Sequence, residues 1–187
     1  LIASSTSRRQ QWVIAVALLL SHWALLAWPA AGSGVGALEP GANTAVRLDR
    51  WMFGTHILTS AGDPEGLLGV LTWVATALFG AISGRQVADA SARLHEAGVR
   101  THLLGTLTAA GLAGIAVGYA WSFALPLNKP LWTASFAVFT AGAATLALVA
   151  FVAVESSVIA SMLAPFEWLG TNPLAIYALS EFTTNLM

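Results

Sequence analysis

The sequence predicts an all-α protein, a multi-spanning membrane helix bundle with about five spans, the last of which is incomplete. Of the 187 residues, 57% are hydrophobic and 9% are charged. Soluble domains carry about 25% charged residues, so this chain cannot cover a surface that faces water. The mean hydropathy is +0.73, and several apolar runs alternate with short polar segments. We therefore predict an integral membrane protein with a single transmembrane domain over residues 1–187.

The composition also excludes several classes of function. A formal net charge of −1, without a run of Lys or Arg, argues against a nucleic-acid partner. The chain has no cysteine, which removes disulfides, thiolate catalysis and Cys-based metal sites together. We predict no metal site.

The first expected span runs from Trp12 to Trp28 and follows Arg8 and Arg9. Tryptophans at both of its ends suit the membrane interface. A secretory or twin-arginine signal is the rival interpretation, which the further spans downstream disfavour. His22 lies inside this span, where an ionisable group is either functional or a neutral imidazole bonded to a neighbouring helix.

Residues 32–62 form the longest polar interval and are predicted to be a non-cytoplasmic loop that serves as a lid or binding loop. Within it, residues 48–54 are predicted to form a short amphipathic turn at the interface. Trp51 and Phe53 would then dip into lipid or protein.

Asp63-Pro64-Glu65-Gly66 stands directly before the second span, Leu67 to Ser83. As a helix start, Asp63 caps free N–H groups, Pro64 suits the first turn and Glu65 faces the positive end of the helix dipole. As a site at the mouth of a membrane helix, the two carboxylates would act on a ligand. Residue chemistry leaves both interpretations open.

Residues 85–100 are predicted to be a cytoplasmic connector containing a short helix. It is supported by two ion pairs in the favourable order, Asp89 with Arg93 and Glu96 with Arg100. In the span before it, Thr72 and Thr76 share one helix face.

The remaining spans follow in order. The third, Leu103 to Phe123, carries a face of glycines suited to close helix packing, namely Gly105, Gly111, Gly114 and Gly118. The fourth runs from Leu131 to Val154. A fifth helix is expected to begin at Asn172-Pro173 and to carry Glu181 roughly 13 Å into it, where a carboxyl group must face protein or water.

Basic residues in the short loops indicate the orientation. Arg8, Arg9, Arg85, Arg93 and Arg100 fall on one side, against Arg47, Arg50 and Lys129 on the other. The heavier side is expected to be cytoplasmic, so the N-terminus of this chain is predicted to be cytoplasmic. We expect the membrane to be a bacterial inner membrane.

Three segments resemble the heparan-α-glucosaminide N-acetyltransferase family, including its NagX-like bacterial members. The first comprises residues 48–50, 56–58 and 63–68, leading into a span that ends at residues 80–84. The second, residues 127–136, is similar to the family's Asn-Lys-x-Leu-Trp-Thr-Ser-Tyr-type motif. The third, residues 169–181, is similar to its Gly-x-Asn-x-Leu-x-x-Tyr helix.

The resemblance implies a membrane acyltransferase that moves an acetyl group from acetyl-CoA, on the cytoplasmic side, to an amino sugar or glycan end of glucosamine type. The family's catalytic histidine lies upstream of these segments. Because the chain begins with Leu1 and its last apolar segment is short, we expect the C-terminal portion of a longer protein, inactive alone.

Candidate site residues follow from this chemistry. Asp63 and Glu65, with His56 in a supporting role, would hold or deprotonate the acceptor amine. Asn128 and Lys129 would bind an oxyanion or a CoA phosphate, unless Lys129 is only an interfacial anchor. Further members of the site are predicted to be Asp49, Arg50, Asn172 and Glu181.

Two other functions stay open on the sequence. A secondary transporter or permease for a sugar or small solute would use Glu181 and His22 to carry protons or bind solute. A membrane scaffold that only packs is the third. Membrane lipid is an expected partner in each case, and a homo-oligomer is left open.

Overall fold

The computed structural model describes residues 6–27, 38, 43–57, 66–154 and 170–186. These residues form six α-helices and no strand. They belong to two compact units, Leu1–Ala147 and Leu148–Met187, which are described separately. Four of the helices are long and apolar enough to cross a membrane. The predicted all-α membrane helix bundle is thus confirmed for the described part of the chain.

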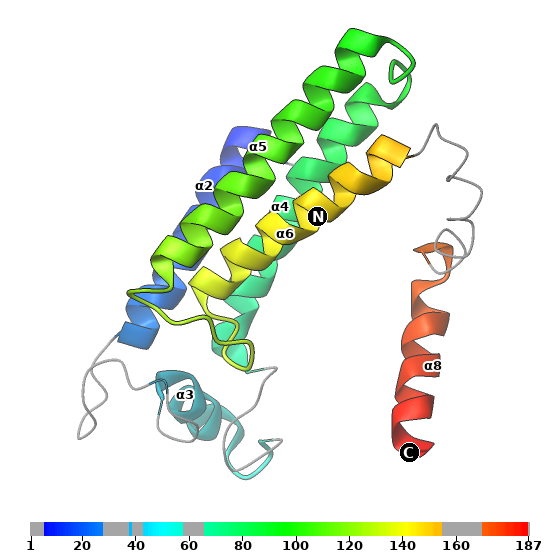
Figure 1. Cartoon of the computed structure of the whole chain (residues 1–187). Coiled ribbons are helices and arrows are strands. Elements are labelled where there is room, and N and C mark those ends of the chain that lie inside the picture. The colour runs from blue at the N-terminus through cyan, green and yellow to red at the C-terminus, as the bar shows by residue number, and fades with distance from the viewer. Residues whose placement is uncertain (1–5, 28–37, 39–42, 58–65, 155–169, 187) are drawn as a thin grey trace. The chain divides into compact units, whose positions relative to one another are not determined.

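The first unit contains α2 (Arg8–Ala27), α3 (Thr44–Phe53), α4 (Leu67–Ser91), α5 (Ala97–Trp121) and most of α6 (Ala134–Val154) (Figure 1). The predicted first, third and fourth spans correspond to α2, α5 and α6. The predicted amphipathic turn over residues 48–54 is the second half of α3. Asn43 caps α3 by accepting a hydrogen bond from the backbone N–H of Val46 at 3.0 Å.

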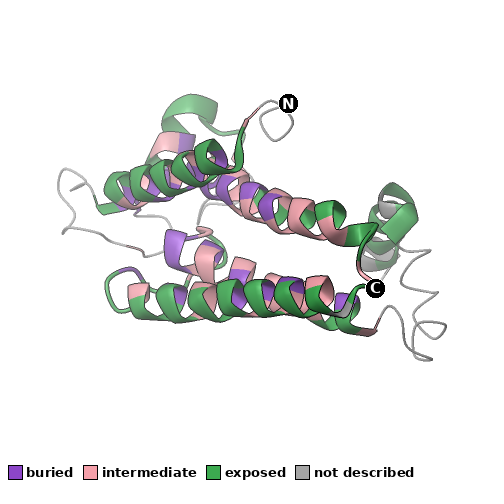
Figure 2. Ribbon diagram, turned by 90° about the horizontal axis from the view of Figure 1, so that it is seen from above, coloured by how far each residue is buried: buried purple, intermediate pink, exposed green. Residues whose placement is uncertain are grey.

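Helices α2 and α4 pack against each other in opposite directions. Trp12 of α2 meets Phe79 of α4 with ring centroids 5.2 Å apart, and Arg8 pairs with Asp89 further along α4. Small and branched side chains fill the contact, and the buried cluster there includes Ala15, Leu19, Ala75 and Leu78. Figure 2 shows buried residues as stripes along the helices, with exposed residues on their outer faces. Such outer faces suit lipid rather than water.

Helices α5 and α6 approach through glycines. A Cβ on Gly114 would lie 2.9 Å from Cα of Gly142, and one on Gly118 would lie 2.5 Å from the backbone nitrogen of Phe139. A Cβ on Gly111 would lie 2.6 Å from the Leu146 side chain and 3.0 Å from the backbone carbonyl oxygen of Gly142. The predicted glycine contact is therefore confirmed at these three positions. It is wrong at Gly105, where a Cβ would meet nothing within 4 Å.

The connector between the second and third spans also differs from the prediction. Helix α4 continues to Ser91, and only residues 92–96 separate it from α5, so the predicted separate helix is absent. Asp89 pairs with Arg8 of α2 rather than with Arg93, and Arg93 pairs with Glu96 at 3.0 Å. A contact between helices has thus replaced the local pairing that the sequence spacing suggested.

The second unit contains the end of α6 and α8 (Pro173–Leu186). Helix α8 begins at the predicted residue, directly after Asn172. The backbone N–H of Ile176 donates to the Asn172 carbonyl at 3.2 Å. Large apolar side chains of α8 are exposed, including Leu174, Tyr177 and Phe182.

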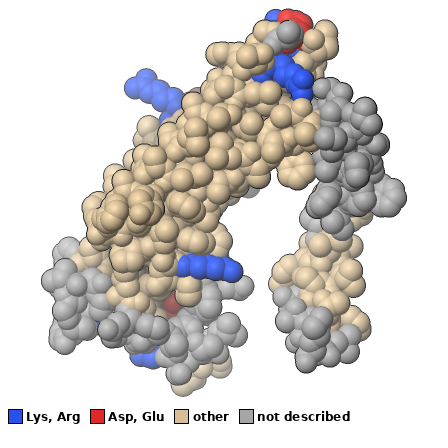
Figure 3. All heavy atoms as spheres, in the orientation of Figure 1, with Lys and Arg blue, Asp and Glu red and all other residues tan. Residues whose placement is uncertain are grey.

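Charged side chains gather toward the two ends of the α2–α6 bundle, with an uncharged surface between them (Figure 3). One end, here called the Arg8 end, holds the start of α2, the end of α4 and the start of α5. The other, here called the Lys129 end, holds α3, the start of α4 and residues 122–133. This separation is the pattern expected of a protein that spans a bilayer.

Candidate functional site

Asp49 joins two of the sequence segments singled out above. Its side chain is only 1% exposed, and its Oδ1 accepts a hydrogen bond from the backbone N–H of Leu67 at 3.0 Å. The carboxylate therefore caps the N-terminus of α4, where the helix dipole favours negative charge. Gly66 is required beside it, because a Cβ there would collide with the Asp49 carboxylate. The predicted importance of Asp49 thus has a structural cause.

Residues 125–135 form a hydrogen-bonded turn at the same end. The side-chain oxygen of Asn128 accepts a hydrogen bond from the backbone N–H of Leu131 at 3.0 Å. The backbone carbonyl of Asn128 accepts one from the backbone N–H of Thr133 at 3.1 Å. The hydroxyl of Thr133 donates to the carbonyl of Pro126 at 3.0 Å, and that of Ser135 donates to the carbonyl of Leu125 at 2.6 Å. Both hydroxyl residues are fully buried. The polar groups of this motif therefore build the turn itself.

Trp132 closes the turn in a strained conformation. Its φ of 45° lies in the left-handed region, which costs a residue other than glycine about 1–3 kcal/mol. The indole compensates by packing: its ring lies 6.4 Å from Trp73 of α4 and 5.2 Å from Phe136 of α6, edge-on in both cases. Strain of this kind concentrates at functional sites, which makes the turn a candidate site.

His22 of α2 faces this turn from inside the bundle. The side chain is fully buried, and its ring lies against the backbone of Leu131. Neither ring nitrogen completes a hydrogen bond of normal geometry with the part of the chain that the structure describes. The indole Nε1 of Trp132 has none there either. A buried imidazole and a buried N–H donor thus lie beside a strained turn, in surroundings where polar groups normally find partners.

The remaining predicted site residues are less concentrated. Asp63 and Glu65 lie outside the described residues. His56 is exposed at the Lys129 end, as are Arg50 and Lys129. Asn172 and Glu181 belong to the second unit; the Asn172 amide donates to the Thr171 hydroxyl at 3.1 Å. Asp49 and Asn128 therefore both lie at the Lys129 end of the bundle.

Asn128 and Lys129 were predicted to bind an oxyanion or a CoA phosphate. Both residues lie at the end opposite to Arg8, and the Asn128 side chain is already engaged within its own turn.

A polar cleft of about 460 Å³ opens at the Arg8 end, between α2, α4 and α5. Arg8 and Asp89 form an ion pair on its wall, and Arg93 and His102 also line it. Hydrogen bonds from Arg93 to the Glu96 carboxylate, both 3.0 Å long, raise the pKa of the guanidinium. Five arginines and two carboxylates occupy residues 6–9 and 85–100, an excess of three positive charges. This end is therefore suited to an anion.

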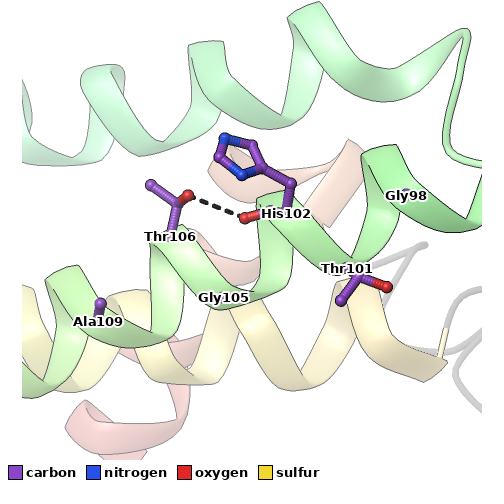
Figure 4. A pocket seen from close by; sticks show the side chains of 6 residues that line it. All are labelled: Gly98, Thr101, His102, Gly105, Thr106 and Ala109. Carbon is purple, nitrogen blue, oxygen red and sulfur yellow. Dashed lines mark hydrogen bonds between the residues drawn. The ribbon is translucent and has the colours of Figure 1, made fainter.

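The neighbouring surface of α5 is open. Figure 4 shows Gly98, Gly105 and Ala109 along this face, with His102 and Thr106 side chains projecting beside them. The Thr106 hydroxyl donates a hydrogen bond to the backbone carbonyl of His102, in the same helix, at 2.8 Å. His102 and Thr106 also line the cleft, so the open face and the cleft are continuous.

A central apolar cavity of about 510 Å³ lies between α2, α4, α5 and α6. Trp12, Leu19, Phe79 and Val117 are among its lining residues, and Gln86 lines both this cavity and the polar cleft. Among the residues that the structure describes, Gln86 is the one lining residue that the two spaces share. No group of three or more His, Cys, Asp or Glu residues that could hold a metal ion occurs within the described ranges.

Sequence reasoning missed three features of this region: the left-handed Trp132, the approach of His22 to Leu131, and the Arg8–Asp89 pair. The last two join residues 109 and 81 positions apart, and no local pattern signals such contacts. Asn43 was also missed as a cap, although Asn before a short amphipathic helix is a recognisable signal.

Comparison of the chain with models of known protein families gave no match, and comparison with curated proteins gave no significant match.

Proposed function

We propose that the chain is part of a membrane-embedded acyltransferase that moves an acetyl group from acetyl-CoA to the amine of a glucosamine-type acceptor. One observation carries this proposal. The segments that resemble the N-acetyltransferase family lie far apart in the sequence, yet two of them lie at the Lys129 end of the bundle. Residues 48–50 cap α4 through Asp49, and residues 127–136 form the strained turn beside His22.

The acceptor is assigned to the Lys129 end. Glu65 directly precedes Gly66, and Asp63 precedes it by three residues. Both carboxylates are thus within four residues, along the sequence, of Leu67, whose N–H donates to Asp49. A carboxylate is the natural partner of an ammonium group at such a boundary. The proposal gives Asp63 and Glu65 the task of holding the acceptor amine and taking its proton.

The donor is assigned to the Arg8 end, which the excess of arginine makes the cytoplasmic one. Acetyl-CoA combines an anionic, phosphate-bearing head with a long uncharged arm. The polar cleft with Arg8, Arg93 and His102 would take the head, and the apolar cavity beyond Gln86 would take the arm. In this proposal the cleft, rather than Asn128 and Lys129, binds the CoA phosphate.

The reaction is a single group transfer. A carboxylate removes a proton from the acceptor ammonium, and the freed lone pair attacks the thioester carbonyl carbon. The new C–N bond forms as the C–S bond breaks. The nitrogen gives its second proton to the leaving thiolate, so CoA leaves as the thiol and the product is an N-acetylated amino sugar. Buried N–H donors near the reacting carbonyl would stabilise its developing negative charge.

The test uses the full-length protein in proteoliposomes with radiolabelled acetyl-CoA and glucosamine. The expected result is labelled N-acetylglucosamine, and production of it falls when Asp63→Asn and Glu65→Gln are combined. Absence of labelled product from correctly folded wild-type protein would overturn the proposal.

The donor assignment has its own test. Ionic contacts of exposed side chains are weak, so Arg93→Gln should raise the KM for acetyl-CoA by only about two- to fivefold. Arg47→Gln is the matched control, because it removes the same charge at the Lys129 end. Equal KM values for the two variants would contradict the placement of the donor head in the cleft.

A secondary transporter is the second candidate, favoured by His22, a buried titratable side chain within a span. Uptake of labelled glucosamine by proteoliposomes, without acetylation, would support the transporter over the transferase.

A further inference from the structure

Helix α3 presents three consecutive large apolar side chains to its surroundings. Trp51 is 81% exposed, Met52 58% and Phe53 41%. Of the other tryptophans that the structure describes, Trp12 is 49% exposed, and Trp23, Trp73, Trp121 and Trp132 are partly buried. An exposed cluster of this kind on one short helix marks a surface that another apolar phase covers.

The exposed face of α3 is fixed in place by its opposite face. Ala45, Val46 and Asp49 are buried against the bundle, and Asn43 caps the first turn. Because Asp49 also binds the backbone of α4, the helix cannot turn about its axis to bury Trp51.

The level of α3 in the bundle identifies what covers this face. The partner of Asp49 is the N–H of Leu67, the first residue of a helix long and apolar enough to span a bilayer. Helix α3 therefore lies where the hydrocarbon region begins, and tryptophan favours that boundary. Arg47 lies one turn before Trp51 on the exposed side, at the reach of lipid phosphates.

A second set of aromatics supports the same boundary. Tyr119 and Phe123, at the end of α5, form an edge-on ring pair with centroids 5.5 Å apart and are 58% and 81% exposed. They belong to the same bundle end as α3. Exposed aromatic rings from two separate elements at one end are typical of the aromatic belt of a membrane protein.

We propose that α3 is an interfacial anchor: Trp51, Met52 and Phe53 enter the acyl-chain region of the leaflet at the Lys129 end, and Arg47 meets the phosphates of that leaflet. The occupant of the face is phospholipid rather than a protein partner. The proposal does not depend on the acyltransferase assignment.

Spin labelling tests it: this chain contains no cysteine, and any cysteine elsewhere in the full-length protein is first replaced by serine. Trp51→Cys, Met52→Cys and Arg47→Cys are each labelled with a nitroxide in the full-length protein, in vesicles of phosphatidylcholine and phosphatidylglycerol. Power saturation compares collisions with oxygen, which enriches in lipid, and with a nickel chelate, which stays in water. Oxygen should dominate at positions 51 and 52, and nickel should dominate at position 47, the matched control on the same helix.

Two results would overturn the proposal. Dominance of nickel at both positions 51 and 52 would place this face in water. Protection of both positions from both reagents would show that protein covers it. Circular dichroism and gel filtration of each labelled variant ensure that only folded protein is compared.

Discussion

Substitution of Gly118 tests the packing of α5 on α6. A methyl group at this position would lie 2.5 Å from the nitrogen and 2.7 Å from Cα of Phe139. Both atoms belong to the backbone of α6, so no side-chain rotation can make room. Gly118→Ala must therefore move the two helices apart or distort one of them.

Gly105→Ala is the matched control. It makes the same chemical change in the same helix, but a methyl group there meets nothing within 4 Å. The intrinsic preference of the helix for Ala over Gly, up to about 1 kcal/mol, is common to both variants and cancels in the comparison. What remains is the cost of overpacking, about 1–3 kcal/mol.

The measurement is the free energy of unfolding of the full-length protein in mixed micelles, titrated with SDS and followed by circular dichroism. The free energy of unfolding of Gly118→Ala should be about 1–3 kcal/mol lower than that of Gly105→Ala. Equal stability within a few tenths of a kcal/mol would refute the close approach of α5 and α6 at Phe139.

Two further stability predictions concern the Lys129 end. Asp49→Ala should lower the free energy of unfolding by about 1–2 kcal/mol, because it removes the cap on Leu67. Asp49→Asn keeps an acceptor oxygen and should therefore retain most of the wild-type stability. Equal losses for the two variants in the same SDS titration would argue against a capping role. Trp132→Ala and Trp132→Gly both lose the ring contacts, but only glycine relieves the strain of the left-handed backbone. The free energy of unfolding of Trp132→Gly should therefore be about 1 kcal/mol higher than that of Trp132→Ala. The reverse order would show that the backbone at this position is not strained.

The helices could be predicted from the sequence because lipid imposes a simple rule. A segment that crosses a bilayer must be apolar and about 20 residues long, and such runs are visible without knowledge of their neighbours. The start of α8 was predicted at the correct residue because the Asn-Pro signal is local. Helix α4 begins at Leu67, where its apolar run begins, but its N-cap is Gly66 and its side-chain cap is the distant Asp49 rather than Asp63. The end of α4 was not, since the polar residues after Ser83 continue the helix and one of them, Asp89, pairs with α2.

The candidate site was less predictable than the fold. Asp49 was expected to matter, but its partner, the N–H of Leu67, lies 18 residues away across a loop. Asn128 was predicted to bind a ligand, and the structure gives it a role in the turn before Trp132. Polar residues in a motif serve either chemistry or backbone geometry, and the sequence alone does not separate these roles.

The glycine contact between α5 and α6 has a consequence for motion in the bundle. Because the two backbones touch at Gly114 and Gly142, neither helix can shift alone, and the pair should behave as one rigid body. Helices α2 and α4 form a second interlocked pair. Both pairs line the apolar cavity. To admit a ligand, the cavity must therefore widen by movement of the α2–α4 pair relative to the α5–α6 pair.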